Sequence, residues 1–142
     1  MIIRDILEPG HILLDQSAGS REALLDLLAQ AAAQRLGLPE ADIRQALTTR
    51  EELGTTGIGG GVAIPHAALD GLEKPFLMPV RLRKPVDVEA LDEAPVDLVF
   101  LALFPQDDQA SALKLMSAIA RRLKEENVAE TLRDATDTEA AF

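Results

Sequence analysis

The stretch Val96-Asp97-Leu98-Val99-Phe100-Leu101-Ala102-Leu103-Phe104 (VDLVFLALF) is apolar at every position except Asp97. In a strand, successive side chains point to opposite faces, so a run without alternation is typical of a strand covered on both sides. We therefore predict a central, fully buried strand here. Segments with helical spacing lie both before and after it in the chain. This order of elements predicts a layered α/β domain.

Two helices are predicted upstream of this strand. Ser20 has the chemistry of an N-cap, apolar residues follow it at helical spacing, and Gly37 ends the run. A second helix is predicted to begin near Pro39 and to end at Gly54. Shorter strands are expected at residues 12–14, 62–64 and 76–82, and further helices at 110–123, at 128–133 and from 137 onward.

Length and composition restrict the class of protein. The 142 residues fit one domain, and 24 acidic against 14 basic side chains give a net charge of −10. Such a charge argues against binding nucleic acid, favours solubility and is compatible with a basic protein partner. There is no cysteine, no apolar run near the roughly 20 residues that span a bilayer, and no secretory signal. We expect a cytoplasmic protein that does not insert into a membrane.

Glycine is concentrated just before one histidine. Five of the nine glycines fall within Gly54–Gly61, and the chain then continues through Val62–Ile64 to Pro65 and His66. Glycine lets backbone approach a ligand closely, and successive N–H groups can converge on an anion. Taken alone, such a loop also fits a simple connector. It lacks the Lys-Ser/Thr ending of a P-loop and precedes a strand, so neither ATP nor a dinucleotide cofactor is expected.

Arg50 and His66 flank this loop and could carry chemistry. Pro65 fixes its own φ and restricts Ile64, so His66 is held on stiff backbone. A neutral imidazole is a nucleophile near pH 7, and a guanidinium fork can bind two phosphoryl oxygens. Each residue alone also fits a structural interpretation: His66 could close a strand, and Arg50 could be a solvated cation at a helix C-terminus. One histidine with scattered carboxylates predicts no metal site.

The segment Thr48–His66, TTREELGTTGIGGGVAIPH, resembles the active-site segment of enzyme IIA of the mannitol/fructose class. This class belongs to the bacterial phosphoenolpyruvate-dependent sugar phosphotransferase system, and the chain is most similar to its nitrogen-regulatory IIA branch. Ala94–Pro105 and Leu113–Leu123 resemble the family's central strand and the helix after it. The resemblance therefore spans nearly the whole chain. It implies one domain over residues 1–142, with three layers and a mixed central sheet flanked by helices.

The resemblance also implies a function and a site. His66 would accept a phosphoryl group from an HPr-like carrier as phosphohistidine, and Arg50 would neutralise its charge. The protein would then be a phosphotransferase component that regulates partner proteins through its phosphorylation state, without a cofactor. The implied phosphoryl-binding loop consists of Thr55, Thr56, Gly57 and Gly59.

One departure from the family pattern leaves alternatives open. Family members often carry a second histidine in a His-Leu-x-x-Leu pattern, and the matching position here is Ala112. The other histidine, His11, cannot be aligned with it and is interpreted as a surface or turn residue. The chain could instead be a sugar-specific IIA that passes phosphate to a IIB domain, or a binding module with a degraded site. The family's last helix is expected to continue past Phe142.

Overall fold

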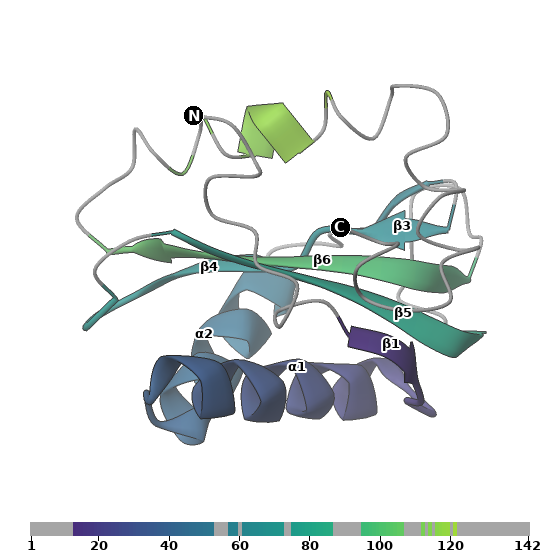
Figure 1. The fold of residues 1–142 in the computed structure, drawn as a ribbon, viewed down its shortest axis with the longest axis horizontal. Coiled ribbons are helices and arrows are strands. Elements are labelled where there is room, and N and C mark those ends of the chain that lie inside the picture. The colour runs from purple at the N-terminus through teal and green to yellow at the C-terminus, as the bar shows by residue number, and fades with distance from the viewer. Residues whose placement is uncertain are drawn as a thin grey trace.

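The computed structural model describes residues 13–52, 57–59, 61–72, 75–86, 95–106, 112, 114, 116–119 and 121. His11, Gly54 and the helices predicted at 128–133 and from 137 lie outside these residues. None of the helices in the described part has the length and apolarity that crossing a membrane requires. The elements, shown in Figure 1, are β1 (Leu13–Gln16), α1 (Arg21–Leu36), α2 (Glu40–Glu52), β2 (Gly57–Gly59), β3 (Val62–Ala63), β4 (His66–Leu69), β5 (Phe76–Val86) and β6 (Val96–Pro105).

The sheet is mixed, and β6 lies at its centre. The strand order is β1-β5-β6-β3-β2, and β4 also pairs with β6. β6 is parallel to β3 and β4 and antiparallel to β5. β1 is parallel to β5, and β2 is antiparallel to β3. The prediction of a central strand at Val96–Phe104 is confirmed.

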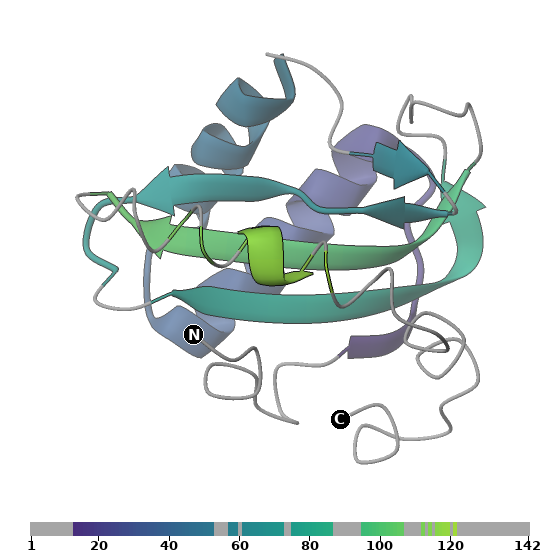
Figure 2. The same cartoon turned by 90° about the horizontal axis from the view of Figure 1, so that it is seen from above.

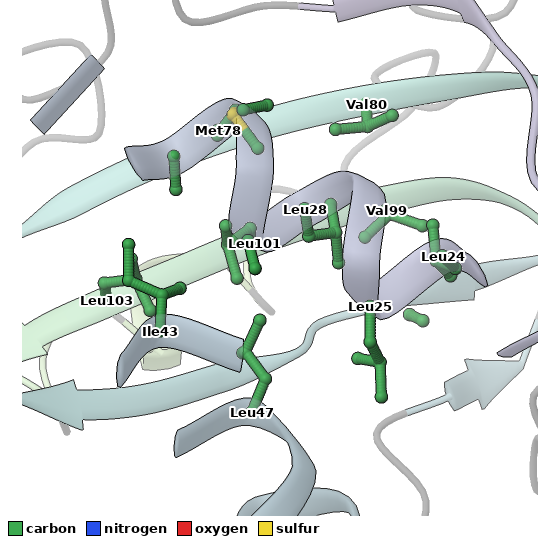
Figure 3. Close-up of a cluster of buried hydrophobic side chains, with 14 of the residues drawn as sticks. Leu24, Leu25, Leu28, Ile43, Leu47, Met78, Val80, Val99, Leu101 and Leu103 are labelled. Atoms are coloured by element: carbon green, nitrogen blue, oxygen red, sulfur yellow. The ribbon is translucent and has the colours of Figure 1, made fainter. Parts of the chain in front are cut away.

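Helices cover both faces of this sheet, which explains the unbroken apolar run in β6. α1 and α2 pack on one face, and the helical residues between 112 and 121 lie over the other (Figures 1 and 2). Val99, Leu101 and Leu103 belong to the cluster with α1 and α2, whereas the alternate residues of β6 pack with Ile119. Figure 3 shows side chains of α1 and α2 meeting those of β5 and β6 in the first cluster. The predicted three-layer α/β fold is confirmed.

Both ends of α1 have the caps that the sequence predicts. The Ser20 side chain accepts a hydrogen bond from the Ala23 N–H at 3.1 Å, which satisfies one of the free donors of the first turn. Gly37 has φ of 69°, and its N–H donates to the Ala33 carbonyl at 2.9 Å. A residue with a side chain is strained at this φ, so glycine is favoured at the helix end.

The structure corrects the prediction of a loop at Gly57–Gly59. These residues form β2, which pairs with β3 as an antiparallel hairpin through Gly57↔Ala63 and Gly59↔Val62. Gly61, at φ of 79°, makes the turn between the two strands. Glycine disfavours strand formation, but here the pairing with β3 outweighs that local preference.

His66 does not lie beyond the end of a strand, as the sequence suggested, but begins β4. β3 and β4 keep one register on β6, with Ala63 opposite Val99 and His66 opposite Ala102. They are therefore two parts of one strand that is interrupted at residues 64–65. The reason is chemical: Pro65 has no N–H to donate to the ladder.

Candidate functional site

The backbone just before His66 has β6 on one side and the described pairings with β2 on the other. The carbonyl of Pro65 accepts from the Ala102 N–H at 3.0 Å, and that of Leu69 accepts from the Gln106 N–H at 3.2 Å. In a strand the hydrogen-bonding groups of successive residues point to opposite sides, so the carbonyl of Ile64 points away from β6. Among the described residues, β2 pairs with residues 62–63 of this strand. The Ile64 carbonyl therefore lies just beyond the last described β2 pairing.

Two hydrogen bonds to described residues bear on the protonation state of the His66 ring. Its Nδ1 lies 2.8 Å from the carbonyl oxygen of Ile64, and its Nε2 accepts from Nε–H of Arg50 at 3.2 Å. A carbonyl oxygen can only accept, and a guanidinium can only donate. Both contacts thus favour the neutral ring with its proton on Nδ1 and its lone pair on Nε2. Nε2 is consequently the ring nitrogen whose lone pair can act as a nucleophile.

Arg50 reaches His66 around the edge of the sheet. Ala67 and Leu69 pack with the cluster that includes α1 and α2, whereas Ile64 packs with the cluster on the opposite face. Because side chains alternate along a strand, His66 belongs to the same face as Ile64. Arg50, in the last turn of α2, approaches from the other face. The pair therefore forms at the edge beside β4, where both layers of helix are within reach.

An open groove of about 690 Å³ runs along this edge. α2 forms one wall, β4 and the end of β6 form the floor, and the second wall comes from the opposite helical layer. The lining residues are Asp42, Gln45, Ala46, Thr49, Arg50, His66, Ala67, Ala68, Leu69, Asp70, Phe104, Pro105, Gln106, Ala112 and Met116. Ala112, where the family resemblance suggested a histidine, thus shares a groove with His66. It offers a methyl group and no hydrogen-bonding side chain.

The predicted site residues fall into two groups. Arg50 and His66, sixteen positions apart in the chain, are in direct contact. Gly57 and Gly59 lie in β2, beside the strand that leads to His66. Thr55 and Thr56 lie outside the described residues, so their place in a phosphoryl-binding loop stays a prediction. Among the described residues, no group of three histidine or acidic side chains is arranged to hold a metal ion.

Sequence reasoning missed two parts of this site. One is the Ile64 carbonyl, whose direction depends on the pairing of its strand with β6. The other is the groove wall on α2, formed by Asp42, Gln45, Ala46 and Thr49. Their spacing of three, one and three residues places them on one helical face, and this was the available signal. The stripe is too polar and too small to be recognised as a buried face.

Fold and site together define a class of protein. A mixed sheet between two helical layers is also the fold of IIA proteins whose structures have been solved. The mannitol IIA of Escherichia coli has this fold, with a TM-score of 0.78 over 94% of both chains, at 20% identity. The family profile described as "Phosphoenolpyruvate-dependent sugar phosphotransferase system, EIIA 2" matches residues 5–142. The chain belongs to this EIIA type 2 family.

Its relatives within the family include nitrogen regulatory proteins. The chain is 42% identical to that of Bradyrhizobium diazoefficiens over 142 residues, covering 100% of this chain and 93% of the relative. It is 40% identical to that of Pseudomonas aeruginosa, covering 99% and 92%. The crystal structure of IIA-Ntr from Neisseria meningitidis matches with a TM-score of 0.89 at 34% identity, over 96% of this chain and 94% of that one. These similarities support a nitrogen-regulatory role within the phosphotransferase system.

Proposed function

We propose that the chain is a cytoplasmic phosphohistidine carrier of the nitrogen-regulatory phosphotransferase system. It accepts a phosphoryl group from an HPr-like protein on His66 and regulates partner proteins through its phosphorylation state. The observation that carries this proposal is the pair of hydrogen bonds on the His66 ring. One fixes the proton on Nδ1, and the other sets a permanent cation beside the nucleophilic Nε2.

The chemistry follows from this arrangement. The Nε2 lone pair attacks phosphorus, the new N–P bond forms, and the bond between phosphorus and the donor's leaving atom breaks with its electron pair. No proton has to leave His66, because Nδ1 keeps its hydrogen and the phosphorylated ring carries the positive charge. The Ile64 carbonyl, 2.8 Å from Nδ1, stabilises that charge. Arg50 loses its bond to Nε2 in this step, and its guanidinium turns to the phosphoryl oxygens.

We assign the remaining phosphoryl contacts to the segment ahead of the histidine, residues 55–59, of which Gly57–Gly59 form β2. Thr55, Thr56, Gly57 and Gly59 would present hydroxyl and backbone N–H groups to the phosphoryl oxygens. The pairing of Gly57 with Ala63 supports this assignment, because it brings the end of that segment to within three residues of His66 along the adjacent strand.

Two alternatives predict other partners. A sugar-specific IIA would pass its phosphoryl group to a IIB domain. The fructose-specific EIIA component of Haloferax volcanii is 33% identical over 125 residues, below the 40–42% of the nitrogen regulatory proteins. A binding module with a degraded site is favoured by Ala112 in the groove beside His66.

Intact-mass spectrometry after incubation with phosphoenolpyruvate, enzyme I and the cognate HPr-like carrier tests the proposal. We expect one acid-labile phosphoryl group on the wild-type chain and none on His66→Ala. The chain offers a matched control, because its second histidine can be changed in His11→Ala, which should be labelled like wild type. Equal labelling of His66→Ala would refute the proposed acceptor. No labelling of the wild type by any cognate carrier would favour the binding module.

A further inference from the structure

The groove beside β4 has opposite charge at its two ends. Arg50 and His66 form one end. Asp42 precedes Arg50 by eight residues in α2, which corresponds to about 12 Å along the helix. Asp70 follows His66 by four residues, about 13 Å along an extended chain. Both aspartates are exposed, and both line the groove.

The two aspartates lie at the same end because α2 runs antiparallel to β4. The C-terminal turn of α2 contacts the start of β4 through Arg50 and His66. At the other end, Leu38, just before α2, lies against Gly71, just after β4: a Cβ built on that glycine would be 3.6 Å from the leucine side chain. Asp42 and Asp70 therefore flank the end of the groove opposite the phosphoryl site.

The surface between these ends is small and apolar. It is formed by Ala46, Ala67, Ala68, Pro105, Ala112 and Met116, together with Leu69 and Phe104, whose side chains are buried. An apolar centre bordered by charged and polar groups is the usual composition of a protein–protein contact. Gln45 and Thr49 line the same groove from the α2 wall and are exposed. The groove therefore offers a protein contact surface with a positive end and a negative end.

We propose that this groove docks the phosphoryl-donor protein in a single orientation, with Asp42 and Asp70 as the residues that select it. The proposal rests on the function proposed above. The donor's phosphorylated residue lies at the Arg50 end, and a lysine or arginine of the donor, about 12 Å away on its surface, lies between the two aspartates. In the reverse orientation both ends would oppose like charges, which disfavours that complex.

The charges favour a protein as the phosphoryl donor over a small molecule. A free phosphorylated molecule can use the Arg50 end, but it has no second group for the carboxylates 12–13 Å away, a separation of roughly eight helical or four extended residues. The net charge of −10 adds a long-range attraction for a basic surface. Asp42 and Asp70 should therefore affect transfer from a protein carrier and leave uptake from a small donor unchanged.

The test compares Asp42→Asn, Asp70→Asn and the double variant with Glu40→Gln. Glu40 is a matched control: it is exposed, lies in the same first turn of α2, and does not line the groove. Rapid-quench measurement of transfer from the phosphorylated HPr-like carrier gives kcat and KM. We expect each Asp variant to lower kcat/KM about 2- to 5-fold at low salt, through KM, and the double variant about 10-fold. The difference in kcat/KM between the Asp variants and wild type should shrink near 1 M salt, and Glu40→Gln should match wild type.

Two results would overturn the docking proposal without affecting the proposed function. One is wild-type transfer by the double variant, and the other is an equal loss in Glu40→Gln, which would indicate general charge attraction. Phosphoramidate, a small phosphoryl donor, distinguishes a failure of the docking proposal from a failure of the proposed function. All variants should be labelled by it at His66 at the wild-type rate. A wild-type chain that takes no label at His66 from either donor would instead refute the proposed function, and the docking proposal with it.

Discussion

Removing the Arg50 side chain tests the site most directly. In the resting protein its Nε–H donates to Nε2 of His66 at 3.2 Å. This hydrogen bond must break before Nε2 can attack phosphorus. The same guanidinium therefore stabilises the resting ring first and the transferred phosphoryl group afterwards. Arg50→Ala removes both effects, and only their difference changes the rate.

The size of this difference can be worked out from the two states. A hydrogen bond that involves a charged group contributes about 1.5–3 kcal/mol, and this is the resting contact that must break. A donor directed at the charge of a transition state contributes about 3–4 kcal/mol. The difference of about 1–2 kcal/mol predicts a 5- to 30-fold lower kcat/KM for phosphoryl uptake in Arg50→Ala. Arg50→Lys keeps the charge but not the fork, so we expect a smaller loss.

The assay is single-turnover transfer from the phosphorylated carrier, with Arg44→Gln as the control. Arg44 lies on the same helix, and its Nε contacts Asp26 Oδ1 at 2.6 Å, away from the groove. The control removes the same charge from α2 and should transfer at the wild-type rate. Unchanged uptake in Arg50→Ala, or an equal loss in Arg44→Gln, would refute the reasoning from the Arg50–His66 contact.

Three further outcomes are expected. Uptake should fall when the pH is lowered far enough to protonate His66, because a protonated ring has no lone pair on Nε2; a rate that does not change on acidification would contradict this. Ala112→His places a second imidazole in the groove and should speed transfer relative to Ala112→Leu, which fills the space without a donor; equal rates in single-turnover assays would exclude such assistance. Leu28→Ala, at a position with 0% exposure, should lower the free energy of unfolding measured in urea by about 2–5 kcal/mol. Gln30→Ala, on the exposed face of α1, should change it little. A loss for Leu28→Ala below about 1 kcal/mol would contradict the packing of α1.

Local patterns predicted the elements that depend on burial and on helix capping. The unbroken apolar run at Val96–Phe104 required cover on both faces, and the structure provides it. Ser20 and Gly37 marked the ends of α1, because capping chemistry acts within one turn of a helix. In contrast, Gly57–Gly59 was predicted as a loop, since its pairing with β3 comes from residues on the far side of a turn.

The candidate site divides in the same way. The sequence by itself determined which groups are available: an imidazole mounted behind Pro65, an arginine at a helix end, and no second histidine at position 112. The tertiary structure alone decided how they meet. The Ile64 carbonyl points away from β6 and lies 2.8 Å from Nδ1 of His66, so it orients the ring. α2 runs antiparallel to β4, so Arg50 reaches Nε2 while Asp42 lies at the same end of the groove as Asp70. These relations depend on the packing of elements distant in the chain, whereas a local pattern records only burial and backbone preference.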